Sequence, residues 1–155
     1  MKRLILLSIL FVLIVSACSQ TSEAATVADN PESIATQSIV KQYIKSIEGY
    51  DADLFTSLLH DEYVFMDYGM GDGPYGKTIL SAFAREAMSE PDTNKTEFGR
   101  YTITPDGRFA VIEGAYSEPA RDGGKWIAAP GYVVLEMKDG KIIAETWYYN
   151  GDVLP

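Results

Sequence analysis

The chain has 155 residues, of which 13 are basic and 22 acidic, and it contains one cysteine and one histidine. A surface this acidic repels polyanions, so nucleic acid is not an expected partner. One cysteine excludes an intramolecular disulfide, and the length after the N-terminal segments is that of a single domain.

The N-terminus has the pattern of an export signal. Lys2 and Arg3 precede an apolar run over residues 4–15 that is too short to span a bilayer, which predicts a signal peptide over residues 1–17. The next residues, "VSAC", resemble the lipobox of bacterial lipoproteins. That resemblance implies a lipid on Cys18, which would anchor the chain on the extracytoplasmic side of a cell-envelope membrane without spanning it. The alternative is a free cysteine after an ordinary signal peptide.

Residues 18–31 are small and polar and predict a flexible tether, followed by one domain over residues 32–155. Within that boundary region, Asn30 and Pro31 form a good helix start. Apolar side chains then recur at helical spacing until Gly49, at Val40, Tyr43, Ile44 and Ile47.

A short second helix is expected after Asp51, which can cap it, and it would present Leu54, Phe55, Leu58 and Leu59 to the core. Alternation predicts a strand over residues 63–68. The glycine-rich run "GMGDGPYGK" predicts a loop, and it could form a lid with Tyr75 at its tip. A third helix follows, with Leu80, Phe83, Ala84 and Ala87 on its apolar face.

From residue 96 onward, β-rich runs alternate with turn signals, which predicts four strands. We therefore expect an α+β fold in which a curved, mainly antiparallel sheet carries the helices on its concave face. Gly131, inside an otherwise good strand, suggests a β-bulge.

The last hairpin can be placed in register if Asp139 and Gly140 form a two-residue turn. Lys138 then faces Lys141, and three further pairs are Glu136 with Ile143, Val134 with Glu145, and Tyr132 with Trp147. Both faces of this hairpin are rather apolar, so the pattern leaves open which one is inside. The outer face is a candidate homodimer interface.

This order of elements, with the motifs "VKQYIKSIEGYDADLFTSLLHDEYVFMDYG", "YGKTILSAF" and "MKDGKIIAETWYYN", resembles the SnoaL-like branch of the nuclear transport factor 2-like superfamily over residues 33–150. The resemblance implies a cone-shaped sheet whose interior holds the active site in the family's enzymes. It also implies that Glu145, Trp147 and Tyr149 point into the cone. The scaffold hosts isomerases, dehydratases, cyclases, epoxide hydrolases and plain binding domains, so it does not fix a function.

Two positions depart from the enzymes of this superfamily. The polyketide cyclases and epoxide hydrolases carry an aspartate where Trp147 stands here, and a second aspartate of the epoxide hydrolases aligns near Ala115. Neither replacement can handle a proton in the same way. Neither mechanism is therefore expected for this chain.

Two carboxylates remain as candidate catalytic groups, Asp67 and Glu145. An apolar cone would raise the pKa of either, which would make it a useful general base near neutral pH, with Tyr149 or Tyr132 stabilising a developing oxyanion. The alternative for Glu145 is a place near the rim of the cone, solvated or hydrogen-bonded to a tyrosine.

A small, largely apolar ligand is the first expectation for the cone. Its expected contacts are Phe65, Tyr75, Glu113, Tyr132, Trp147 and Tyr149. Glu113 could instead be a solvated acid at the surface. No cofactor is expected. No metal is expected either, because the chain offers a single histidine, His60, and a cysteine that carries lipid. The functions left open are ligand binding, a small lyase or isomerase, and a dimerising interaction module.

Overall fold

A computed structural model describes residues 30–90, 93–120 and 125–153. The expected signal peptide and Cys18 lie outside the described residues, as does the expected tether up to residue 29. Among the described helices, none is both long enough and apolar enough to cross a membrane.

Two capped helices open the domain. Helix α1 (Pro31–Glu48) begins where Asn30 accepts a hydrogen bond from the backbone amide of Ser33, and it ends at Gly49. Helix α2 (Ala52–Leu58) begins where the side chain of Asp51 accepts from the amide of Leu54. Both helices therefore start at the residues that the sequence predicts, and α1 also ends there. Leu59, expected in the second helix, instead begins strand β1 (Leu59–Asp67), which starts four residues before the predicted strand at residues 63–68.

The glycine-rich run, which the sequence predicts to be a loop, contains a strand. Strand β1 (Leu59–Asp67) turns over residues 68–71 into β2 (Asp72–Gly76), which pairs with it in antiparallel fashion. Tyr75 thus lies in an edge strand opposite Phe65, and their rings stack with centroids 6.4 Å apart. Of the five residues of β2 only Tyr75 favours a strand, so composition concealed it. Helix α3 (Lys77–Ser89) follows directly.

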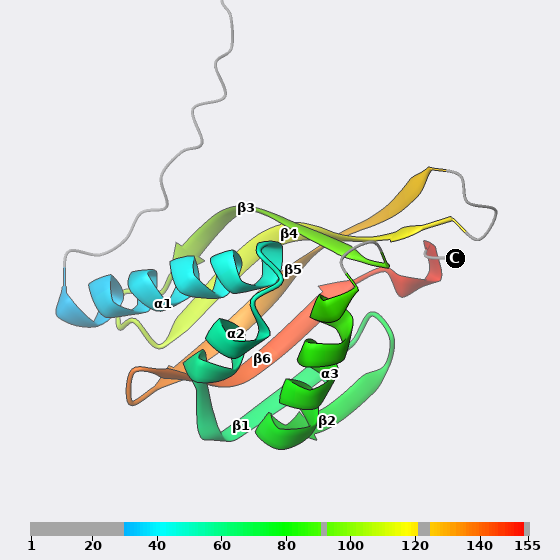
Figure 1. Ribbon diagram of the computed structural model, residues 1–155. Coiled ribbons are helices and arrows are strands. Elements are labelled where there is room, and N and C mark those ends of the chain that lie inside the picture. The colour runs from blue at the N-terminus through cyan, green and yellow to red at the C-terminus, as the bar shows by residue number, and fades with distance from the viewer. Residues whose placement is uncertain (1–29, 91–92, 121–124, 154–155) are drawn as a thin grey trace, which may run out of the picture.

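Six strands form one mixed sheet in the order β2-β1-β6-β5-β4-β3. Strands β3 (Lys95–Ile103), β4 (Phe109–Pro119), β5 (Trp126–Lys138) and β6 (Lys141–Tyr149) make an antiparallel meander. The last of them pairs in parallel with β1. All three helices lie on one face of this curved sheet, with α1 against β3 and α3 against β1 and β2 (Figure 1). The predicted α+β class, with a mixed curved sheet, is confirmed.

A β-bulge in the last hairpin overturns most of the predicted register. Lys138 does face Lys141, but Met137 pairs with Ile142 and Glu136 with Ala144, so β6 carries one extra residue, Ile143. Every later pair shifts by one. As a result, Leu135 faces Glu145, Val133 faces Trp147 and Tyr132 faces Tyr148.

Gly131 is not the site of the bulge, because the pairing of β4 with β5 runs unbroken from Phe109 with Glu136 to Pro119 with Trp126. Instead, Gly131 allows a close approach of β6. A Cβ atom at this position would lie 2.1 Å from the carbonyl oxygen of Tyr148 and 2.7 Å from the Cβ of Tyr149. Only glycine fits there without a shift of the backbone.

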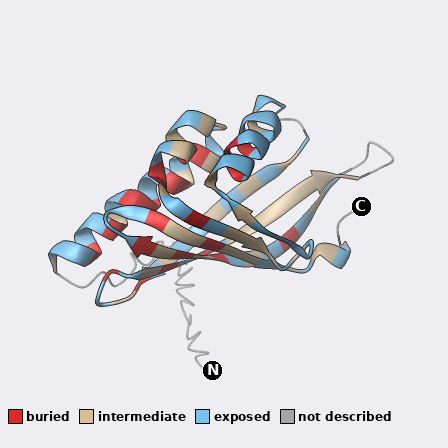
Figure 2. Ribbon diagram, turned by 90° about the horizontal axis from the view of Figure 1, so that it is seen from below, coloured by how far each residue is buried: buried red, intermediate tan, exposed pale blue. Residues whose placement is uncertain are grey.

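The core fills the space between the helices and the concave face of the sheet, where the buried residues of both layers meet (Figure 2). Its largest fully buried side chains include Tyr43, Tyr63, Ile112, Leu135 and Ile142. The opposite face of the sheet carries exposed aromatic rings. Tyr148 stacks between Tyr68 and Tyr132 there, at centroid distances of 5.1 and 5.2 Å. This outer face is the candidate homodimer interface, which stays a prediction.

Candidate functional site

A cavity of about 250 Å³ lies between the sheet and helices α2 and α3. Its walls are mainly apolar and aromatic, and they include Phe55, Phe65, Leu80, Phe83, Ala84, Met88, Tyr116, Trp147 and Tyr149. Two carboxylates, Asp67 from the end of β1 and Glu145 from the middle of β6, belong to the same wall. Residues from distant parts of the chain meet here because β1 and β6 are adjacent, with Asp67 opposite Trp147.

Glu145 is held by three donors at the base of this cavity. The hydroxyl of Tyr43 and the indole N–H of Trp147 donate to Oε1 at 2.6 and 2.5 Å, and the hydroxyl of Tyr63 donates to Oε2 at 2.6 Å. The residue is 2% exposed. The sequence left open whether Glu145 is solvated or hydrogen-bonded to a tyrosine. The structure shows hydrogen bonds from two tyrosines to a buried side chain.

Burial dominates the ionisation of this cluster. It raises the pKa of Glu145 above its ordinary value of 4.5, although the hydrogen bonds from Tyr43, Tyr63 and Trp147 favour the charged form and oppose the shift. The negative charge of Asp67 adds to the increase. Burial and the neighbouring Glu145 also raise the pKa values of Tyr43 and Tyr63, so both hydroxyls keep their protons and act as donors.

Asp67 is half-buried, and both of its carboxylate oxygens accept hydrogen bonds from the protein. Its Oδ1 accepts from the amides of Gly69 and Met70 at 2.8 and 3.0 Å, and its Oδ2 accepts from the hydroxyl of Tyr149 at 2.9 Å. Gly69 makes this arrangement possible, because a Cβ there would lie 2.6 Å from the ring of Tyr149. Burial and the adjacent Asp67 raise the pKa of Tyr149, which keeps its hydroxyl a donor.

The predicted site residues divide into three groups. Asp67, Glu145, Phe65, Trp147 and Tyr149 all line the cavity.

Tyr75 stands behind the cavity wall, against the cavity-lining rings of Phe65 and Phe83. Tyr132 and Glu113 lie on the outer face of the sheet. Tyr132 is 49% exposed because the bulge in β6 places it opposite Tyr148 and not opposite Trp147. Glu113 is exposed and paired with Arg100 at 2.9 Å. The expectation that Tyr132 faces inward is therefore wrong, and of the two alternatives for Glu113 the structure shows the acid at the surface.

Three tyrosines at the site are missed by sequence reasoning. Tyr43 lies in a predicted helical stripe and Tyr63 in a predicted strand, and nothing local marks them as partners of a glutamate 102 and 82 residues away. The ring of Tyr116 lines the cavity, while its hydroxyl donates to Glu118 at 2.8 Å. The alternation of β4 could have indicated an inward Tyr116, but no local signal sets the register of that strand.

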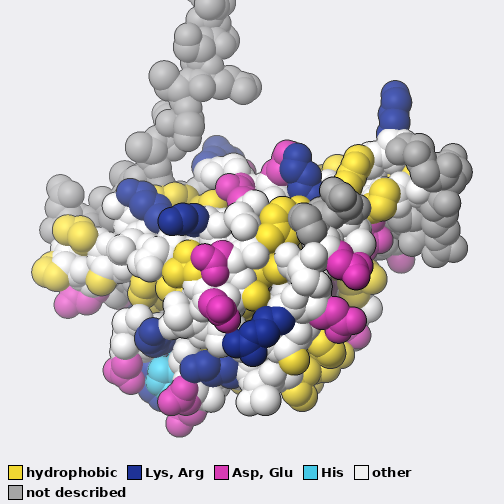
Figure 3. Space-filling model, in the orientation of Figure 1, with side chains coloured by type: hydrophobic (Ala, Val, Ile, Leu, Met, Phe, Trp, Pro, Cys, Tyr) yellow, Lys and Arg dark blue, Asp and Glu magenta, His cyan; other side chains and the backbone are white. Residues whose placement is uncertain are grey.

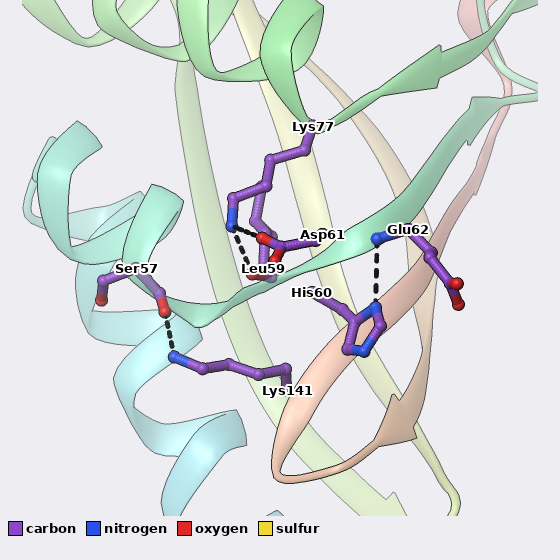
Figure 4. Close-up of polar contacts among 7 residues, drawn as sticks. All are labelled: Ser57, Leu59, His60, Asp61, Glu62, Lys77 and Lys141. Carbon is purple, nitrogen blue, oxygen red and sulfur yellow. Dashed lines mark hydrogen bonds and ion pairs between the residues drawn. The ribbon is translucent and has the colours of Figure 1, made fainter.

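His60 lies away from the cavity, at the junction of α2 and β1 (Figure 4). Its Nδ1 accepts from the backbone amide of Glu62 at 3.1 Å. Nearby, Lys141 donates to the carbonyl of Ser57, and Lys77 donates to the carbonyl of Leu59. In the part of the chain that the structure describes, no group of three or more His, Cys, Asp and Glu side chains could hold a metal ion.

The raised pKa of Glu145 predicts a pH-dependent stability difference between the protein and its Glu145→Gln variant. Native Glu145 binds a proton more tightly than the unfolded chain does, so its contribution to stability falls as pH rises from 4.5 through the raised pKa. The amide side chain of the variant has no such titration. Urea unfolding at several pH values should show the stability of the parent falling relative to that of the variant over this range. A constant difference would contradict the assigned direction of the shift.

The comparisons with known proteins fit this geometry. A family profile described as the SnoaL-like domain matches residues 40–145. The chain belongs to the SnoaL-like family. No curated protein sequence matches this SnoaL-like chain.

Solved structures of low sequence identity share the SnoaL-like fold. One is an LEH-like epoxide hydrolase from M. tuberculosis, with 16% identity, a TM-score of 0.62, and coverage of 77% of this chain and 86% of that one. Another is a ketosteroid isomerase-like fold from Catenulispora acidiphila, described in complex with trimethylamine, with 16% identity, a TM-score of 0.63, and coverage of 74% and 87%. A third is SalBIII, an epoxide hydrolase/cyclase-like enzyme of salinomycin pyran formation, with 14% identity, a TM-score of 0.63, and coverage of 76% and 92%.

Proposed function

We propose that this SnoaL-like domain binds a small, largely apolar molecule in the cavity, and that a lipid on Cys18 holds it at the extracytoplasmic surface of a membrane. The observation that carries the binding proposal is the cavity itself, about 250 Å³ and walled mainly by apolar and aromatic side chains. Pockets of this kind obtain affinity from apolar contact and orientation from a few polar groups. The carboxylates of Asp67 and Glu145 are the charged groups among the described residues that line the cavity.

The anchoring proposal rests on the sequence around Cys18. A lipidated cysteine followed by a short polar segment would keep the domain near the membrane while leaving the cavity accessible from water. Acidic and basic side chains are interspersed on the face of the domain that Figure 3 shows. Mass spectrometry of the membrane fraction should detect acyl chains on Cys18, and an unmodified thiol there would remove this part of the proposal.

Filling the cavity should abolish binding without unfolding the domain. Ala84, on α3, lines the cavity and is 9% exposed, so Ala84→Phe places a ring in the space that a ligand would occupy. The neutral apolar dye N-phenyl-1-naphthylamine is the probe. Its fluorescence should rise on binding the parent protein and stay low with the variant.

The matched control is Ala128→Phe, because Ala128 is exposed on β5 and does not line the cavity. It should bind the dye as the parent does. Thermal unfolding checks that both variants fold, since overpacking by a ring costs about 1–3 kcal/mol. Equal dye binding by Ala84→Phe and the parent would contradict the proposed location.

A small lyase or isomerase is the second candidate, and the exposure of Asp67 favours it. Glu145 is 2% exposed within a buried cluster, whereas Asp67 is half-buried at the cavity wall with the hydroxyl of Tyr149 beside it. Asp67 is therefore the better placed proton acceptor. Native mass spectrometry should identify a co-purified molecule. Conversion of this molecule by the parent protein but not by Asp67→Asn would support catalysis. A molecule that is unchanged after incubation with the parent protein would support binding alone.

A further inference from the structure

In the described part of the chain, the two carboxylates of the cavity have no cationic partner among the residues that line it. Among the described residues that line the cavity there is no Lys, Arg or His, so Asp67 and Glu145 supply all of its formal charge. The donors to Glu145 are two tyrosines and a tryptophan, all of which are neutral. A buried negative charge without a counter-charge is costly, and a cationic ligand would compensate for it.

The cavity also contains three aromatic rings that contact one another beside these carboxylates. The ring of Trp147 meets those of Tyr116 and Tyr149 at centroid distances of 6.3 Å each, at interplanar angles of 83° and 80°. The ring centroids of Tyr116 and Tyr149 are 5.5 Å apart, and the hydroxyl of Tyr149 donates a hydrogen bond to Asp67. Rings inclined in this way present several faces and edges to one small volume, and ring faces attract organic cations.

From the aromatic walls, the two carboxylates and the absence of a cationic side chain among the described lining residues, we propose that the ligand of this cavity is a small organic ammonium ion with apolar substituents. The inference rests on the proposed binding function and specifies its ligand class. The alkyl groups of such an ion fill the apolar space along Phe65 and Leu80. Its charge lies by the rings of Trp147 and Tyr149, where Asp67 compensates for it.

Two probes of the same shape and different charge test this assignment. Choline carries a trimethylammonium group, and 3,3-dimethylbutan-1-ol replaces its nitrogen by carbon, so the second is a neutral isostere. Isothermal titration calorimetry of the full chain at low salt should give about tenfold tighter binding of choline, the ratio that corresponds to a modest cation–π and ion-pair contribution. The preference should weaken as salt is added.

Asp67→Asn removes the charge, while the amide oxygen of the new side chain can still accept from the backbone amides of Gly69 and Met70. This variant should bind choline about as weakly as the neutral isostere. Glu113→Gln is the control, because it removes the same charge from the outer face, and it should leave the preference for choline intact. Thermal unfolding checks that each variant is folded. The preference of the parent protein for choline is measured without either variant, so it tests the ligand class even if a variant fails to fold.

The outcomes separate this inference from the proposed function. If the neutral isostere binds as tightly as choline or more tightly, the cationic ligand is excluded while apolar binding stands. If choline is preferred but Asp67→Asn retains the preference, the role given to Asp67 is overturned. If neither probe binds and the apolar dye does not bind either, the cavity is not a ligand site and both proposals fail.

Discussion

Replacing Glu145 by leucine should destabilise the domain by about 3–5 kcal/mol, because it leaves the hydroxyls of Tyr43 and Tyr63 and the indole N–H of Trp147 without their acceptor. The side chain is 2% exposed, so water cannot easily replace the carboxylate. Urea unfolding measures the effect. Glu113→Leu is the control, since this glutamate is exposed and its change should stay within about 1 kcal/mol.

A double-mutant cycle shows whether hydrogen bonding is the cause. Tyr63→Phe alone removes a hydrogen bond to a charged group, which costs about 1.5–3 kcal/mol. In the Glu145→Leu background the same change removes a hydroxyl that no longer has its partner, so it should cost almost nothing. Additive effects of the two changes would show that Glu145 stabilises the domain by some other route.

Gly131→Ala should have the second largest effect, a loss of about 3 kcal/mol in unfolding free energy. The new Cβ would lie 2.1 Å from the carbonyl oxygen of Tyr148, a backbone atom that can move only if β6 moves away from β5. Because Tyr149 follows directly and lines the cavity, the variant should also bind the apolar dye more weakly.

Gly99→Ala provides the comparison for this change. Gly99 also lies in a strand, β3, but a Cβ there would have only an ordinary contact, 3.7 Å from the carbonyl oxygen of Glu113. This variant should match the parent in stability or exceed it by up to about 1 kcal/mol, since alanine is favoured over glycine inside a strand. Similar losses for both variants would show that the close approach of β6 is not the cause.

The sequence predicted the elements that have strong local signals. Caps and helical spacing located α1 and α2 because Asn30, Gly49 and Asp51 satisfy backbone groups next to themselves. Strand β2 was missed because its pairing with β1, rather than its own residues, makes it a strand. A curved, mainly antiparallel sheet was expected, but no local pattern indicates that β1 pairs in parallel with β6.

The site was predictable in part, where the residues themselves carry a local signal. Asp67 and Glu145 were singled out as acids in apolar surroundings, and both line the cavity. One extra residue in β6, Ile143, then placed Tyr132 on the face of Tyr148 instead of that of Trp147, since side chains alternate and a single insertion changes which residues share a face. The donors to Glu145 come from α1 and β1, and contacts over such distances in the chain leave no mark in the sequence near residue 145.

The parallel pairing of β1 with β6 also bears on how the chain reaches this structure. Phe65 lies opposite Glu145, so the pairing must close a loop of about 80 residues and adds strongly to the contact order, which slows folding. Until β6 arrives, one edge of β1 has no neighbour, and the hairpin of β1 and β2 is marginal alone. Partly folded molecules therefore expose an open strand edge that can recruit other chains, so we expect refolding yields to fall as protein concentration rises.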